Sequence, residues 1–537
     1  MHGYYSAAIP FEGGKHGMGI LTRERPLRVR RLALPGTEEA RTCMIAEFSE
    51  YIFCGTHLSV TDTDQIASLQ IIVREAEKTG KPFFLAGDLN CEPGSRTGQW
   101  LGRNFILLSD TAHHTWPADK PVKTIDYIAL YKNNAARSIV KLKTRMMDET
   151  KASDHRAVYA DIRFRISPEK LFFGEPYLQD MTDDGITVMF QTRTPVSTWI
   201  EYGTDTLHLQ SARTLLAGQE PCLGLENSIR LDGIQRDVKY YYRVCAREVQ
   251  LNEAYYKILG NTVKTPFYSF TLPSSHTQDF TAFVMNDLHE RDDVMQRLLE
   301  VVRQKGFSHF DFGFYNGDCV PDPYGQEHTI VRVNKLMTAV NASECFTTLI
   351  RGNHEIRNAY SAGLVSLMRN FGGKTYGAFT WGNTRFVVLD CSEDKPDSTW
   401  VYYGLNDFSK LRKDQVEFLK KEISSKAFRK AHHHILLNHI PIWGEDDVYT
   451  DGFHPWTALW EPLLKKAGFD IDIVAHAHNY YFYEKGVKGN PVPQYGGGSP
   501  SLGSQDIGTI AILQSRGESL RLIVFDAAGN KRLDREL

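Results

Sequence analysis

Five short blocks between Asp287 and His478 are rich in Asp, Asn and His, the residue types that bind metal ions. They read MNDLHE (Asp287, His289), YNGDCV (Asp318), RGNHEI (Asn353, His354, Glu355), LLNHIP (His439) and VAHAHN (His476, His478). Most follow a compact apolar run, such as FTAFVM in front of the first block. Buried parallel strands of open α/β sheets carry such polar loops at their carboxyl ends, so we expect the blocks to share one edge.

These side chains suit a site with two metal ions. Carboxylate, carboxamide and imidazole groups bind Zn, Fe or Mn without any need for cysteine. One aspartate can bridge two ions, and ions roughly 3.5–4 Å apart hold both the attacking and the leaving oxygen of a phosphoryl displacement. Water bound to such ions becomes a hydroxide nucleophile near neutral pH. The residue types therefore predict metal-dependent hydrolysis of phosphoesters.

In this order the blocks resemble the calcineurin-like metallophosphoesterase family, with its D-x-H, G-D, G-N-H-E, H and G-H-x-H motifs. The resemblance implies that residues 274–537 form an α/β domain with two sheets flanked by helices. It implies His354 as proton donor or phosphate contact, and Arg351 is a further candidate to bind the phosphate. It also implies two divalent or trivalent ions (Fe, Zn or Mn), one held by Asp287, His289, Asp318 and His478, the other by Asp318, Asn353, His439 and His476.

Two residues depart from the family pattern. Ala475 replaces the glycine of the last motif, a small change that we expect the loop to tolerate. Pro321 stands where the purple acid phosphatase branch has a tyrosine, so a tyrosinate ligand is not expected.

Residues 1–165 carry a second series of polar strand ends. The helix-like run DTDQIASLQIIVREAEKTG has apolar residues at helical spacing and stops at Gly80. Strand-like runs alternate with it, which predicts a layered α/β sandwich. The polar residues lie in YIFCGTHL (His57), KPFFLAGDLN (Asp88, Asn90), TIDYIAL (Asp126) and KASDHRAVYADI (Asp154, His155).

These blocks resemble the endonuclease/exonuclease/phosphatase family of Mg-dependent phosphoesterases. The resemblance implies that Asp88 and Asn90 orient the attacking water and the phosphate, while His57 contacts the phosphate or acts as an acid. It implies that Asp126 fixes the tautomer of His155, which faces the phosphate.

The same family implies that Asp154 helps to hold Mg. In that family, the first strands and the Mg-binding glutamate come before a tract that resembles EGGKHGMGIL. In this sequence the tract begins at Glu12, so those strands and that glutamate are expected to be missing. The intact remaining blocks favour a fragment of a longer chain over a domain that has lost catalysis. Mg is therefore expected only where that missing part is present.

Residues 169–273 predict a small antiparallel β-sandwich, because strand-like runs such as ITVMFQT alternate with turn signals and no helical period occurs. The segment resembles the fibronectin type III-like domain that precedes the catalytic domain of purple acid phosphatases. We interpret it as a spacer or docking module. In the last domain, the apolar runs between Thr509 and Phe525 are expected to close the second sheet.

The composition is that of an ordinary globular protein of about three or four domains, with 537 residues, 42% hydrophobic and 24% charged. A net charge of -3 argues against a surface made for nonspecific binding of nucleic acid or membranes, and no obligate nucleic-acid partner is evident. No apolar run is long enough to span a bilayer, and no signal peptide is visible. Because the N-terminus looks truncated, the compartment stays open, export included. Cys222 and Cys245 are the only pair considered for a disulfide.

The leading hypothesis is a phosphoester hydrolase acting on monoesters or diesters through the C-terminal metal pair. One alternative is a nuclease or lipid phosphodiesterase activity centred on the N-terminal domain of a longer chain. Another is a non-catalytic binding protein. The sequence leaves open the substrate, the metals and the oligomeric state.

Overall fold

The computed structural model describes residues 1–444, 453–500 and 507–537. These residues form two compact units. Unit 1 contains Met1–Ser167 with Gln250–Gly260, and unit 2 contains Pro168–Val249 with Asn261–Leu537. Within the described ranges, every helix is too short or too polar to span a lipid bilayer.

Unit 1 is built on a mixed six-stranded sheet with the order β3-β4-β5-β6-β8-β7. Its strands β5 and β6 are parallel and their neighbours are antiparallel. The strands are β3 (Arg28–Leu34), β4 (Arg41–Glu47), β5 (Ile52–His57), β6 (Phe83–Asp88), β7 (Phe105–Leu107) and β8 (Asp126–Tyr131). The parallel pair places the carboxyl ends of β5 and β6 at the same edge of the sheet.

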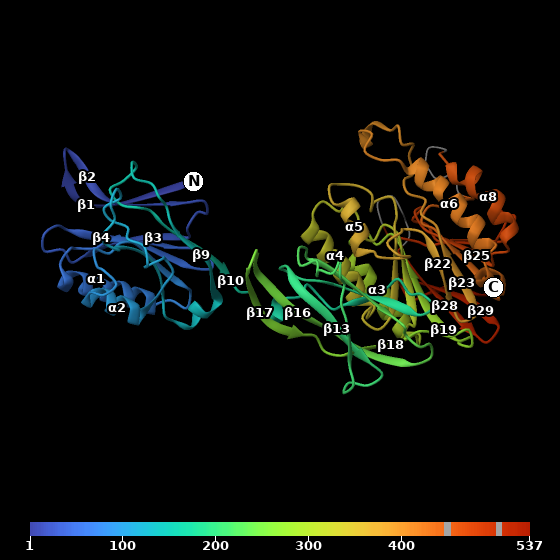
Figure 1. Ribbon diagram of the computed structural model, residues 1–537. Coiled ribbons are helices and arrows are strands. Elements are labelled where there is room, and N and C mark those ends of the chain that lie inside the picture. Colours follow the sequence, from blue (N-terminus) through green and yellow to red (C-terminus); the bar gives the residue numbers. More distant parts are fainter. Residues whose placement is uncertain (445–452, 501–506) are drawn as a thin grey trace. The chain divides into compact units, whose positions relative to one another are not determined.

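Unit 1 has further layers on the two faces of this sheet. Helices α1 (Asp62–Glu77) and α2 (Arg96–Asn104) cover one face, where Leu69 and Ile72 pack on strand residues such as Leu85 (Figure 1). Two antiparallel pairs pack on residues of the other face. They are β1 (His2–Phe11) with β2 (Gly14–Thr22), and β9 (Ile139–Met146) with β10 (Val158–Phe164). The layered α/β arrangement predicted from the sequence is confirmed.

The first part of unit 2 consists of two antiparallel sheets. The strands are β11 (Tyr177–Gln179), β12 (Gly185–Gln191), β13 (Val196–Gly203), β14 (Gln210–Ala212), β15 (Glu226–Asp232), β16 (Lys239–Glu253), β17 (Tyr256–Lys264) and β18 (Tyr268–Thr271). The parts of β16 and β17 within residues 250–260 belong to unit 1. They form a three-stranded sheet β11-β12-β15 and a five-stranded sheet in which β18 also pairs with β16. This part shares one hydrophobic core with the rest of unit 2. The resemblance to a fibronectin type III-like domain stays a prediction.

The remainder of unit 2 contains two six-stranded sheets, β21-β20-β19-β28-β29-β30 and β22-β23-β24-β25-β27-β26. The first sheet contains β19 (Phe280–Met285), β20 (Phe312–Asn316), β21 (Phe346–Ile350), β28 (Thr509–Arg516), β29 (Ser519–Asp526) and β30 (Lys531–Glu536). The second contains β22 (Gly377–Trp381), β23 (Thr384–Val388), β24 (His433–Leu437), β25 (Ile471–Val474), β26 (Tyr481–Tyr483) and β27 (Gln494–Gly496). Strands β19, β20 and β21 are parallel, and so are β23, β24, β25 and β27.

Side-chain alternation explains why these two sheets pack face to face. In β19, Ala282 and Val284 point into the core between the sheets, whereas Phe283 and Met285 point into the core beneath the helices. Figure 1 shows helices on both outer sides of the paired sheets. The helices are α3 (Asp292–Gln304), α4 (Gln326–Ala339) and α5 (Ser361–Leu367) on the first sheet, and α6 (Phe408–Ile423), α7 (Lys426–Lys430) and α8 (Pro455–Ala467) on the second.

One sequence-based expectation about unit 2 is wrong. The tail strands β28 and β29 do not close the second sheet, because β28 pairs with β19 and so extends the first. Cys222 and Cys245, the only pair considered for a disulfide, are free thiols, as are the other six cysteines.

Candidate metal centre

The five polar blocks of unit 2 come together because each follows a parallel strand. Asp287, Asp318 and Asn353 lie beyond the carboxyl ends of β19, β20 and β21, while His439 and His476 lie beyond those of β24 and β25. Parallel strands present their carboxyl ends at one edge, so the two facing sheets supply one cluster.

The backbone at this edge has an unusual conformation. Asp287, His289, Asp318, His476 and His478 all have positive φ angles, between 41° and 64°. Residues other than glycine adopt this left-handed region at a cost and keep it where the surrounding structure requires it, most often at functional sites. The left-handed backbone is therefore an independent indication that this edge is a site.

One group of side chains contains Asp287, His289, Asp318 and His478, whose ligand atoms all lie within 4.8 Å of one another. The Nε2 atoms of His289 and His478 are 3.4 Å apart, and His478 Nε2 is 3.3 Å from Asp287 Oδ1. This is the first of the two predicted ligand sets.

A second group contains Asp318, His439 and His476, again within 4.8 Å of one another. The side-chain amide of Asn353 lies 3.3 Å from His439 Nε2 and 3.0 Å from His476 Nδ1. Asp318 belongs to both groups, so the structure brings all seven residues of the predicted unit 2 ligand sets together around one shared carboxylate.

The donor atoms of the second group fit a metal ion. His439 Nδ1 is 2.8 Å from the carbonyl oxygen of Asn316, to which it donates, so Nε2 is the ring atom that faces the cluster. Nε2 lies 3.3 Å from Asp318 Oδ2 and 3.3 Å from the side-chain amide of Asn353. A metal ion that replaced the Nε2 proton would find an imidazole nitrogen and a carboxylate oxygen at this position.

Electrostatics at the cluster also favours a cation. Burial raises the pKa of Asp318, but the hydrogen bond and charge of His439, together with the charges of His354 and His289, lower it by more, and the pKa lies well below its usual value. Burial lowers the pKa of His439, but Asp318 and Asp287 raise it by more, to about 10. The two buried carboxylates thus attract positive charge, which metal ions would supply.

Glu355 has a role that the sequence analysis did not find. Its carboxylate is fully buried and accepts backbone N–H groups from two ligand-bearing loops. Oε2 accepts from Asp318 and Gly352 at 2.8 Å each, and Oε1 accepts from Cys319 at 2.8 Å and Val320 at 2.7 Å. It therefore fixes the backbone of the loop that carries the shared aspartate.

His354 lies beside the two groups without belonging to either. Its backbone N–H donates to Asp318 Oδ1 at 2.8 Å, and its ring makes an edge contact with His289. Arg357 Nη1 lies 3.0 Å from His354 Nε2. Burial lowers the pKa of His354, and although Asp318 raises it, the result is about 4. The imidazole is therefore neutral at pH 7.

Arg351 does not face the cluster as suggested from the sequence. Its guanidinium forms a buried ion pair with Asp390, with Nη2 2.7 Å from Oδ2. The arginine next to His354 at the cluster is Arg357, six residues further along the same loop.

Unit 1 brings together four of its six predicted site residues. His57, Asp88 and Asp126 are direct neighbours across β5, β6 and β8. His155 Nδ1 is 2.9 Å from Asp126 Oδ2, and His155 Nε2 is 3.9 Å from Asp88 Oδ2. Asp88, Asp126 and His155 form a third group of potential metal ligands.

The remaining two predicted residues of unit 1 differ in their placement. Asn90 has a left-handed backbone (φ 51°), donates its backbone N–H to Asp88 Oδ1, and turns its side-chain amide to the carbonyl of Leu58. Asp154 is exposed and lies outside the group formed by Asp88, Asp126 and His155.

Burial and neighbouring charges shift the pKa values of Asp88 and His155 in unit 1. Burial raises the pKa of Asp88 to about 6, and the neighbouring Asp126 adds to this. Burial lowers the pKa of His155, but the hydrogen bond that its Nδ1 donates to Asp126 and the charge of Asp126 together raise it by more. Asp126 therefore favours the protonated, correctly oriented form of His155.

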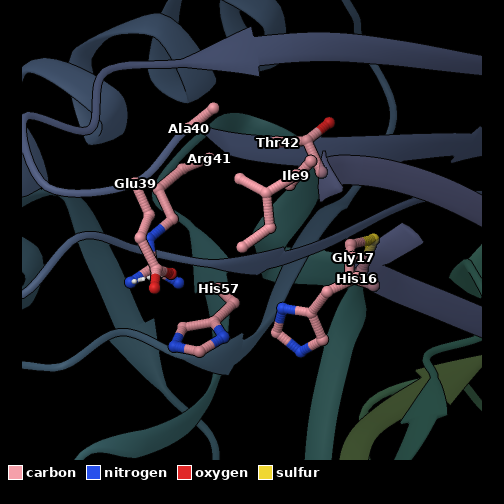
Figure 2. Close-up of a pocket in the computed structure, with 10 residues that line it drawn as sticks. Ile9, His16, Gly17, Glu39, Ala40, Arg41, Thr42 and His57 are labelled. Carbon is pink, nitrogen blue, oxygen red and sulfur yellow. Dashed lines mark ion pairs between the residues drawn. The ribbon is translucent and has the colours of Figure 1, made fainter. Parts of the chain in front are cut away.

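A small pocket next to His57 is lined by basic side chains. Figure 2 shows the rings of His57 and His16 at one end of this pocket, and Arg41 with Glu39 at its side. Arg41 is nearly buried and lies 3.5 Å from Glu39. Burial lowers the pKa of His57, and the nearby Arg41, His155 and His16 lower it further.

Comparison with known proteins gives two family matches. Residues 280–480 match the family model described as calcineurin-like phosphoesterase, and residues 2–155 match the endonuclease/exonuclease/phosphatase family. Both resemblances inferred from the sequence are confirmed. A comparison with curated protein sequences finds no match.

Several solved structures are similar to parts of the chain. A purple acid phosphatase from yellow lupin (Lupinus luteus) seeds is 14% identical, with a TM-score of 0.48, over 67% of this chain and 73% of that one. The structure of PhoD is 13% identical, with a TM-score of 0.46, over 68% and 93%. The human Nocturnin catalytic domain with bound sulfate is 16% identical, with a TM-score of 0.25, over 30% and 72%.

Proposed function

We propose that this chain, a phosphoester hydrolase with a calcineurin-like phosphoesterase domain in residues 280–480, cleaves phosphate monoesters or diesters at the unit 2 cluster. The observation that carries the proposal is the position of Asp318. It is buried and belongs to both groups of ligand atoms, as a residue that bridges two metal ions must.

The proposed ligand sets follow the two groups. Asp287, His289, Asp318 and His478 would hold one ion, and Asp318, Asn353, His439 and His476 would hold the other. Nitrogen and oxygen donors of these types suit Fe, Zn or Mn. When bound, the ions supply charge stabilisation for the phosphate and activate water for attack.

The protein's own groups would orient the substrate. His354 is neutral and lies beside Asp318, so its ring N–H can donate a hydrogen bond to a phosphate or leaving-group oxygen. Arg357 lies next to it and offers a guanidinium that is one-third exposed. Together they would place two donors at the open side of the cluster.

The test is hydrolysis of a chromogenic phosphomonoester and a chromogenic phosphodiester by the full chain, after chelation and addition of Mn, Zn or Fe. Asp318→Asn should lower the metal-restored rate by at least about 100-fold, because both ions lose a ligand. Asp88→Asn is the matched control, an identical change at the unit 1 group. An Asp318→Asn rate equal to that of the wild type would disprove the proposal.

A second candidate function is phosphodiester hydrolysis in unit 1. It rests on His155, whose Nδ1 is fixed by Asp126 while Nε2 faces Asp88. A magnesium-dependent activity of a nuclease or lipid phosphodiesterase would fit this arrangement. It would be lost in Asp88→Asn and kept in Asp318→Asn, the reverse of the pattern expected for unit 2.

A further inference from the structure

A pocket of about 650 Å³ lies beside the unit 2 cluster. Arg357 and Glu393 line it, together with the apolar side chains of Ile356, Val401 and Phe408. This volume falls in the range of sites that enclose small organic molecules. None of the residues proposed as metal ligands lines the pocket, so its contents would be something other than the metal-bound phosphate.

Arg357 lies between the pocket and His354, which lies beside the metal cluster. That side chain lines the pocket and also places Nη1 3.0 Å from His354 Nε2. His354 in turn lies against Asp318. A phosphate bound at the cluster would therefore have the pocket next to its open side, within reach of the organic group that it carries.

The rim of the pocket is unusually apolar. Leu405 lines the pocket although 90% of it is exposed, and Val401 beside it is also exposed. Trp400 and Tyr403, which flank Val401, are 76% and 80% exposed. Four large apolar side chains within six residues are more than a surface turn needs, and such patches mark binding sites.

The basic side chains of the pocket are paired. The buried Glu393 carboxylate has Lys395 at 3.6 Å and Arg357 at 3.8 Å, and Lys395 also contacts Asp394, which does not line the pocket. Both basic side chains therefore have a carboxylate partner, so neither is an unpaired cation that would attract a second anionic group. Asn406 adds one buried acceptor, because its Oδ1 has no hydrogen-bond partner within the described part of the chain.

We propose that this pocket binds the organic group of the substrate and selects phosphoesters whose organic group is large, uncharged and mainly apolar. The proposal rests on the function proposed above, because it assigns the phosphate to the metal cluster. Small esters and polyphosphates would be poor substrates, since they leave the apolar walls in contact with water. The favoured group could be aromatic or aliphatic, and both are included in the test.

The first measurement is binding of phosphonates to the metal-loaded full chain by calorimetry, because phosphonates bind without being cleaved. Hexylphosphonate should bind about 10-fold more tightly than ethylphosphonate, as expected if about half of the added methylene surface becomes buried. Benzylphosphonate, compared with hexylphosphonate, shows whether the aromatic rim favours a ring over a chain. Equal binding of all three would overturn the proposal.

The variant Leu405→Glu tests the rim directly. It should reduce the preference for hexylphosphonate over ethylphosphonate to less than about 2-fold, since a carboxylate replaces apolar surface. Leu207→Glu is the matched control, because Leu207 is 84% exposed in the segment between β13 and β14 and lines no part of this pocket. An unchanged preference in Leu405→Glu would also overturn the proposal.

Hydrolysis of ethyl and hexyl phosphate separates this proposal from the proposed function. Cleavage of both esters at equal kcat/KM would support the function and contradict the pocket assignment. Selective phosphonate binding without cleavage of any phosphoester would support the pocket assignment and contradict the function.

Discussion

Glu355→Gln is the substitution that best isolates the support of the proposed metal centre. The carboxylate accepts four backbone N–H groups, two on each oxygen. Glutamine replaces one oxygen with a donor, so two buried N–H groups lose their acceptor. The change therefore acts on the backbone of the Asp318 loop without altering the side chain of any proposed metal ligand.

The expected magnitude follows from two opposing terms. Two lost hydrogen bonds to a charged group cost about 3–6 kcal/mol. Burial raises the pKa of Glu355 from 4.5 to about 7, and the nearby Asp318 adds to this. Removing the buried charge would raise the free energy of unfolding by about 3 kcal/mol at neutral pH. The net loss in the free energy of unfolding should therefore be about 0–3 kcal/mol.

Metal affinity is the more specific readout of Glu355→Gln. Loss of a group that orients metal ligands lowers metal affinity by about 10–100-fold, measured by calorimetry or by competition with a chelator. Glu422→Gln is the control, because Glu422 is a buried carboxylate paired with Arg385 on the outer side of the second sheet. It should lower stability and leave metal affinity unchanged. Wild-type metal affinity in Glu355→Gln would refute the reasoning.

Three further predictions follow from the structure. Burial raises the pKa of Asp472 to about 7, although Gln494 opposes this, so stability present at low pH is lost as the pH rises towards 7. The free energy of unfolding of Asp472→Asn, measured by denaturation, should not show this loss. Its excess over the wild type should grow to about 4 kcal/mol between pH 4 and 7, and the same pH dependence in both proteins would contradict the prediction. Gly317→Ala should lower the free energy of unfolding by at least about 2 kcal/mol and weaken metal binding, because φ of Gly317 is +83° and a Cβ would lie 2.1 Å from His439 Nδ1. A melting temperature equal to that of the wild type would contradict this prediction. Chelation should reduce the free energy of unfolding by about 3 kcal/mol relative to protein with metal at 100 times its Kd, reversibly on metal addition, whereas no shift on chelation would argue against bound metal.

The sequence predicted which residues of unit 2 lie together, because its signals are local. Each proposed ligand of unit 2 follows an apolar run that forms a parallel strand, and the rule that such strands end at one edge was enough to group them. The left-handed backbone of residues such as Asp318 and His478 carries no sequence signal, since glycine is absent from those positions.

The parts that the sequence missed depend on contacts between distant residues. In the described part of the chain, Glu355 accepts hydrogen bonds from backbone N–H groups, which the sequence does not reveal. Arg351 turns away from the cluster because Asp390, which lies beyond the end of β23, neutralises it. The tail strand β28 pairs with β19, and nothing in its apolar pattern distinguishes one sheet edge from another.

The most direct test of a two-metal centre at Asp318 is the number of ions bound per chain. The measurement is made in the Asp88→Asn background by elemental analysis, after loading with Zn or Mn and removal of free metal, so that unit 1 does not contribute. We predict two ions per chain, and loss of both when Asp318→Asn is added, because each ion loses a shared ligand. One ion per chain, or two ions that persist in the double variant, would contradict the account.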